Sequence, residues 1–142
     1  TTKMAMTFDH LKPGNAAEAK TAAGLDPAKD YSTDPACVAC HTTGYGKEGG
    51  FVDEATTPEL LGVGCEMCHG AGGAYVADDK MSLKNKEYKR ADVIAAGMVH
   101  PVGEAQCVVC HNDKSPTGGA FDWTTMKDQG THENFPLKYN HD

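Results

Sequence analysis

Cysteine and histidine recur in this sequence at one fixed spacing. All six cysteines fall into Cys-x-x-Cys pairs, and a histidine follows each pair at once: Cys37, Cys40, His41; Cys65, Cys68, His69; and Cys107, Cys110, His111. Positions i, i+3 and i+4 share one face of a helical turn. Two thiols on that face can add to the two vinyl groups of a porphyrin while the imidazole binds its iron, and Cys-x-x-Cys-His is the attachment signature of c-type haem. The pattern predicts three covalently attached haem c groups.

Other uses of paired cysteines fit the pattern less well. A zinc site would use two pairs and leave the third idle. A thioredoxin-like motif would occur once, beside a βαβ unit that this sequence lacks. Disulfides of small secreted domains rarely give three identical spacings. Because histidine is about one residue in 20, three chance hits after the pairs have odds of roughly 1 in 8,000.

The apolar content is too low for a self-sufficient core. Leu, Ile, Val and Phe make up 20 of the 142 residues, or about 14%, below the roughly 20% at which a chain struggles to offset its ordering entropy. Such a chain is either disordered or filled by something that is not an amino acid. Three haems would supply the missing apolar volume. We therefore expect one triheme cytochrome domain over residues 1–142, mainly α-helical, with extensive loops, little β-structure and a haem-packed core.

The segments between the motifs are predicted to be short helices and turns. Helices are expected over 15–23, 87–96 and from 124 to 127 or beyond, and the third attachment turn over 104–111. Asp26-Pro27 and Asp34-Pro35 each combine an N-cap with proline at the first helical position, and the second pair would start the turn that carries Cys37.

Glycine and proline mark the loops around the second motif. A short hairpin is expected at Phe51-Val52 and a turn over 57–61. Gly62 and Gly64 would let the backbone approach the second haem closely.

The charge balance excludes some classes of partner. The formal net charge is −7 with a pI of about 5.4, so nucleic-acid binding is disfavoured and the docking face of a redox partner should be basic. No run approaches the ~18 apolar residues of a membrane span. The sequence opens at Thr1 without a leader, as a mature or leaderless form would. Since haem attachment of this type takes place outside the bacterial cytoplasmic membrane, a periplasmic or extracellular location is expected.

The glycine-framed haem turns resemble those of the cytochrome c-554 family. The resemblance rests on His41-Thr-Thr-Gly-Tyr-Gly and on Gly62-Val-Gly-Cys-Glu-Met-Cys-His-Gly-Ala-Gly72, with support from Leu25-Asp-Pro-Ala-Lys-Asp-Tyr31 and from Leu11-Lys-Pro. It implies a mainly helical fold with four haems, whose neighbouring porphyrins are stacked or edge-on.

Two departures from that pattern are linked. The family's first Cys-x-x-Cys-His lies ahead of the Leu-Lys-Pro segment, where this sequence begins too late to hold it. The histidine that follows the family's Cys-His-Gly is also missing, and Tyr75 and Asp79 occupy its neighbourhood. If that histidine serves the first haem, the resemblance implies a four-haem plan reduced to three.

Each iron needs a second axial ligand besides the histidine of its motif. Four histidines remain, each by default a solvated surface residue: His10, His100, His132 and His141. The resemblance implies that His132 binds the iron of the His111 haem. It also implies a ligand for the His69 haem near His10, which we favour. Alignment with the family pattern without gaps puts Met4 at that position instead. An iron bound by histidine and methionine would have a higher reduction potential than one bound by two histidines.

The haem of His41 has three options. His100 precedes Pro101, which biases it toward an extended backbone that either presents its imidazole to a haem or marks a turn. His141 is the second option. The third is no protein ligand, and the resemblance implies that some members do have an open iron position.

Three functions follow from these ligand options. Fully ligated haems held close together would make the protein an electron carrier, which we favour because no general acid or base stands out. An open iron would make it an enzyme that reduces a small nitrogen or sulfur species. Alternatively, the chain is a subunit of an extracellular haem filament that self-assembles through haem contacts, with His141 binding an iron in the next subunit. A frayed tail is the default interpretation of His141.

Overall fold

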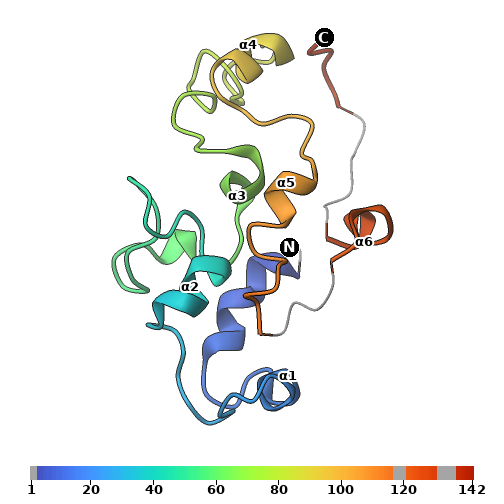
Figure 1. Ribbon diagram of the computed structural model, residues 1–142. Coiled ribbons are helices and arrows are strands. Elements are labelled where there is room, and N and C mark those ends of the chain that lie inside the picture. Colours follow the sequence, from blue (N-terminus) through green and yellow to red (C-terminus); the bar gives the residue numbers. More distant parts are fainter. Residues whose placement is uncertain (1–2, 117–120, 131–136) are drawn as a thin grey trace.

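Short helices joined by long irregular loops make up the protein (Figure 1). The computed structural model describes residues 3–116, 121–130 and 137–142. Its elements, in chain order, are the 3-10 helix η1 (Met4–Leu11), α1 (Ala17–Ala22), α2 (Pro35–His41), the 3-10 helix η2 (Pro58–Leu60), α3 (Cys65–His69), α4 (Arg90–Ala95), α5 (Glu104–Cys107) and α6 (Trp123–Gly130).

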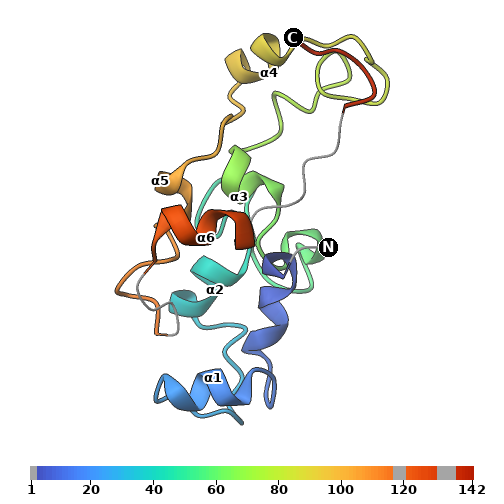
Figure 2. The same cartoon turned by 90° about the vertical axis from the view of Figure 1, so that its right-hand side faces the viewer.

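The arrangement confirms a mainly helical fold with little β-structure. Within the described residues, β pairing is limited to the isolated bridges Thr42–Leu61 and Ser82–Asn85. None of the helices described there is long and apolar enough to cross a bilayer. In two perpendicular views α1 lies at one end of the molecule and α4, beside the C-terminus, lies at the other, with α2, α3 and α5 between them (Figures 1 and 2).

The haem motifs lie on α2, α3 and α5. The N-cap predicted for α2 is confirmed, because the Asp34 side chain accepts a hydrogen bond of 3.0 Å from the Ala36 amide and Pro35 opens the helix. The third motif starts on α5 and continues as a turn in which the His111 amide donates to the Cys107 carbonyl at 2.9 Å. Each motif thus occupies a helical turn, as its spacing predicts.

Two local predictions are wrong for reasons of packing. No helix follows Asp26-Pro27, since the chain turns back there: the Asp26 carboxylate caps the Ala28 amide, and the Pro27 carbonyl accepts from Gly14. No hairpin forms at Phe51-Val52, where the Phe51 amide makes a single bond to Thr43.

Other predicted helices are confirmed with shifted ends. Helix α1 falls within 15–23, and α6 begins at Trp123. Helix α4 is shorter than the predicted 87–96 because it begins at Arg90, whose amide binds the His141 carbonyl at 2.7 Å. Gly24 and Gly97, at φ +72° and +106°, follow α1 and α4 as the predicted left-handed stops.

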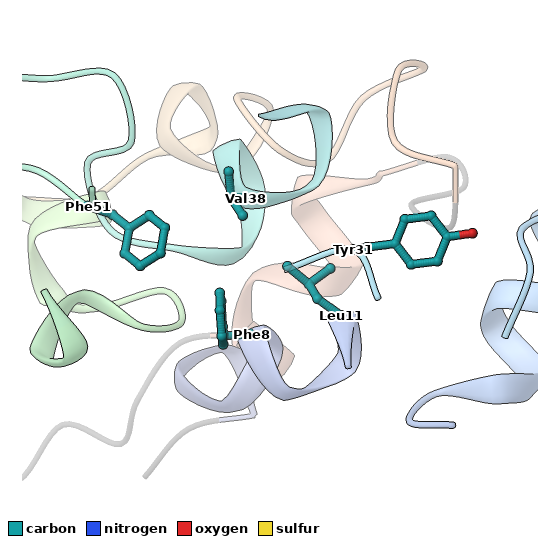
Figure 3. Close-up of a cluster of buried hydrophobic side chains, with 5 residues drawn as sticks. All are labelled: Phe8, Leu11, Tyr31, Val38 and Phe51. Atoms are coloured by element: carbon teal, nitrogen blue, oxygen red, sulfur yellow. The ribbon is translucent and has the colours of Figure 1, made fainter. Parts of the chain in front are cut away.

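A small hydrophobic cluster joins η1 to α2 (Figure 3). It consists of Phe8, Leu11, Tyr31, Val38 and Phe51, with the rings of Phe8 and Phe51 5.9 Å apart. Elsewhere among the described residues, Tyr75 and Val93 are the other fully buried large apolar side chains. The protein interior formed by amino acids is thus confined largely to the N-terminal half, which leaves the region around α3 and α5 to be completed by another apolar group.

Gly62 and Gly64 make close approaches, although both are to protein atoms. A Cβ on Gly62 would lie 2.1 Å from the Ala5 carbonyl oxygen of η1, and one on Gly64 would lie 2.9 Å from Thr43 Oγ1. The Gly64 amide donates to the same hydroxyl at 2.8 Å. The chain that enters α3 therefore packs directly on η1.

Replacing Gly62 with alanine should weaken this packing. Gly62 has a φ of +76°, which costs roughly 1–2 kcal/mol for an L side chain, and the clash with Ala5 adds about 1–3 kcal/mol. Gly73→Ala is the matched control, because no atom lies within 4 Å of its added Cβ. Urea unfolding of the two holoprotein variants checks the difference, and equal midpoints would contradict the packing described here.

Candidate haem sites

The imidazole of His41 is oriented by η1. Its Nδ1 lies 2.6 Å from the Thr7 carbonyl oxygen, so iron binding falls to Nε2, the arrangement that fixes the tautomer of many metal-binding histidines. Burial lowers the pKa of His41, and the neighbouring His10 lowers it further, against the Thr7 bond, which raises it. The neutral imidazole, which is the form that binds metal, is therefore favoured.

The imidazole of His69 is oriented in the same way by the segment after α4. Its Nδ1 lies 2.9 Å from the Val99 carbonyl oxygen, and the Val99 amide donates to the His69 carbonyl at 2.9 Å. These two bonds hold the segment against the haem turn. His100 follows directly and is exposed, on the segment of chain that contacts His69.

Phe121, just before α6, covers the imidazole of His111. The two rings are stacked at 5.0 Å with an interplanar angle of 25°. An aromatic side chain packed on a ligand ring limits its rotation, so Phe121 is a positioning residue for the third motif.

The three motifs converge, and the first and second also meet directly, since the Gly44 amide donates to the Met67 sulfur at 3.2 Å. Helices α3 and α5 pack together. Burial, then Cys40 and then Cys68, raises the pKa of Cys110 to about 12, and burial followed by Cys68 raises the pKa of Cys107. The third pair of thiols therefore neighbours both the first and the second pair. Since attachment consumes these thiols, the shifts describe the chain before haem is bound, when the protonated thiols are weak nucleophiles.

His10 lies beside His41. The ring centroids are 6.4 Å apart with an interplanar angle of 68°. Metal–imidazole bonds of about 2.0–2.1 Å put two rings on opposite sides of one metal at a centroid distance of about 6.3 Å. The spacing fits His10 as a ligand of the His41 haem, and this differs from the sequence-based pairing of His10 with the haem of His69.

The remaining candidates lie in different places. Met4 is near the second motif, because its carbonyl accepts from the Val63 amide at 3.0 Å, so it stays an alternative ligand for the His69 haem. His141 is buried beside Tyr88, at the end of the molecule away from His41. His132 lies outside the described residues.

The residues present fit covalent haem. The thiols and histidines share helical turns, and apolar side chains at and near the motifs are exposed, among them Met6 at 54% and Val109 at 61%. A porphyrin disc would cover such surfaces. Among the residues that the structure describes, no group of three or more His, Cys, Asp or Glu is placed to hold a bare metal ion, so a zinc ligand set is not formed there.

Sequence reasoning missed the groups that orient the ligands. The carbonyls of Thr7 and Val99 belong to the backbone, which has no residue-type signature. Phe121 could have been found only by noting an aromatic residue after the third motif.

Comparisons with known proteins identify the family. The family model for cytochrome c554 and c-prime matches residues 1–70. The chain is 40% identical over 126 residues to cytochrome c-554 of Nitrosomonas europaea, covering 84% of this chain and 53% of the relative. It therefore spans about half the length of that curated relative.

A solved structure of a relative has a similar fold. The reduced state of cytochrome c554 from Nitrosomonas europaea matches with a TM-score of 0.67 and 34% identity, covering 92% of this chain and 69% of that one. Together with the haem turns described above, this match places the chain in the cytochrome c554 family of multihaem c-type cytochromes, whose haem is bound covalently.

Proposed function

We propose that the chain is a periplasmic or extracellular electron-transfer protein whose three motifs each carry one c-type haem. The convergence of the motifs supports this function most directly. Thioether links at neighbouring thiols would hold the His111 haem next to both the His41 and the His69 haems. An electron entering at one haem would then reach the others by short steps.

The ligation of the His41 iron decides between a carrier and an enzyme. If His41 and His10 both hold this iron, it would have no open position, and a haem held by two histidines changes oxidation state with little rearrangement. The protein then tunes each potential through axial ligands, burial and nearby charge. An enzyme would need an iron that stays open to a small nitrogen or sulfur species.

The negative charge of the chain indicates what kind of redox partner it would bind. With a net charge of −7 before haem propionates are counted, the chain should dock transiently on a redox partner with a basic face. Covalent attachment of haem to Cys-x-x-Cys-His takes place outside the bacterial cytoplasm, which is the basis for the proposed location.

Replacing His10 with alanine tests the proposed ligation. We expect the His41 iron to change from low-spin to high-spin and to bind carbon monoxide when reduced, because a histidine ligand is lost. EPR and optical spectra of the holoprotein report the change.

His100→Ala is the comparison variant, because His100 is another candidate for this iron in the sequence; if His10 is the ligand, the His41 iron should keep its wild-type spectrum. Unchanged low-spin spectra in His10→Ala would exclude His10 as the ligand. A wild-type protein that already binds carbon monoxide at a high-spin iron would favour the enzyme.

A further inference from the structure

The C-terminal residues are docked onto the start of α4. The Arg90 amide binds the His141 carbonyl at 2.7 Å, and the Arg90 guanidinium lies 3.1 Å from an Asp142 carboxylate oxygen. Lys89 Nζ donates to the Asp142 carbonyl at 2.8 Å. These contacts hold the end of the sequence in place, so the interpretation of His141 as part of a frayed tail is wrong.

The imidazole of His141 is prepared in the same way as those of two haem motifs. Only 6% of the residue is exposed, and its ring is stacked on Tyr88 at 3.8 Å with an interplanar angle of 10°. Its Nδ1 lies 2.9 Å from the Tyr88 carbonyl oxygen. His41 and His69 also bind a backbone carbonyl through Nδ1, which is the usual outer support of a metal-binding histidine.

The hydrogen bond of Nδ1 leaves Nε2 as the ring nitrogen of His141 for a metal. Nδ1 is taken by the Tyr88 carbonyl, and no hydrogen bond between described residues uses Nε2, so Nε2 is the nitrogen that would bind a metal. The described rings that lie near His141 are those of Tyr88 and Tyr139. None of the described haem-motif histidines faces it at the spacing that two ligands of one iron require.

Contacts through α4 connect His141 to the second haem turn. It packs against the start of α4, and the chain that leaves α4 contacts the second haem turn, where Val99 binds His69. A Cβ on Gly70, directly after His69, would lie 3.3 Å from the Gly97 carbonyl. A haem bound at His141 would therefore lie at the α4 end of the molecule, beyond the His69 haem.

We propose that His141 is an axial ligand for a c-type haem whose own attachment motif lies outside these 142 residues. Nε2 would donate its lone pair to the open sixth position of that iron. The haem would come from another part of the same polypeptide or from a second copy of the chain, in which the His69 or the His111 iron would be open until His141 binds it. This rests on the proposed electron-transfer function and extends it, since the added haem would continue the electron path at the α4 end.

A haem peptide with one histidine-ligated iron and an open sixth position is the probe for this site. Titrated with the purified three-haem chain, it should become low-spin. His141→Ala should weaken its binding at least about tenfold, the effect that even loss of an outer-shell partner has on metal affinity. His141→Met should give a low-spin complex of higher potential, because methionine replaces histidine at the iron. A purely structural role for His141 predicts neither change.

A control variant and the oligomeric state of the chain complete the experiment. His100→Ala should bind the peptide as the wild type does, and the spectra of the three resident haems show whether each variant is folded and whether the proposed function itself holds. If the chain assembles as its concentration rises, gains a low-spin iron and loses both in His141→Ala, the source of the haem is a second copy. A chain that stays monomeric and binds only the peptide points to another part of the same polypeptide as the source. Equal peptide affinity for wild type and His141→Ala would overturn the proposal.

Discussion

Serine at both Cys107 and Cys110 should leave two haems that exchange electrons more slowly. The third pair of thiols neighbours both Cys40 and Cys68, so we expect its haem to link the other two. Without thioether links the porphyrin is held only by its axial ligands and is lost during maturation or purification. The expected result is two haems per chain and slower intramolecular electron transfer, measured after rapid injection of one electron.

A second double variant separates haem position from haem number. Serine at Cys65 and Cys68 also removes one haem, but the haems of His41 and His111 remain neighbours. Electron exchange between the remaining two should therefore persist. If both double variants lose, or both keep, rapid exchange, the third haem does not link the other two.

Truncating Phe8 to alanine should destabilise the N-terminal half more than any other single change to an apolar residue. Phe8 is 2% exposed and packs against Phe51 in the cluster that joins η1 to α2. Loss of a buried phenylalanine costs about 3–5 kcal/mol, out of a total of about 5–15 kcal/mol for a typical domain. Since η1 also carries Thr7 and His10, the His41 haem should lose its low-spin spectrum at lower urea concentration.

Leu83→Ala serves as the control for apolar truncation. Its side chain is 96% exposed, so the free energy of unfolding should change by no more than about 0.5 kcal/mol. Urea unfolding followed by both far-ultraviolet circular dichroism and the haem spectrum measures the two variants. A Phe8→Ala midpoint equal to that of Leu83→Ala would show that the cluster does not hold η1 on α2.

The haem motifs could be predicted from the sequence because each is a local pattern. Two thiols and an imidazole within five residues need only one helical turn to share a face. The neighbour of His41 could not be predicted in this way. His10 reaches it because η1 crosses α2, and that crossing depends on Phe8 and Val38, which are 30 residues apart in the sequence.

Identical local signals had different outcomes at two Asp-Pro pairs. Asp34-Pro35 starts α2, whereas Asp26-Pro27 starts only a turn, although both carboxylates cap the amide two residues on. The difference lies in long-range contacts, because the Pro27 carbonyl is bound by Gly14 and the Tyr31 amide by Leu11. A capping signal therefore marks where a helix can begin, while tertiary packing decides whether it continues.

The docked C-terminus illustrates a second limit of sequence reasoning. Lys89 and Arg90 bind Asp142 and His141 across more than 50 residues, and nothing in the local pattern at either end indicates the other. The buried environment of His141 was for this reason visible only in the structure.

The number of haems per chain tests the central claim most directly. Few amino-acid side chains are buried in the protein interior, so porphyrins linked at all three motifs are needed to complete it. Intact mass spectrometry of the purified protein, with haem quantified after denaturation, should give three covalently bound haems for each 15.0 kDa polypeptide. A folded, colourless chain with the mass of the bare polypeptide would contradict the account.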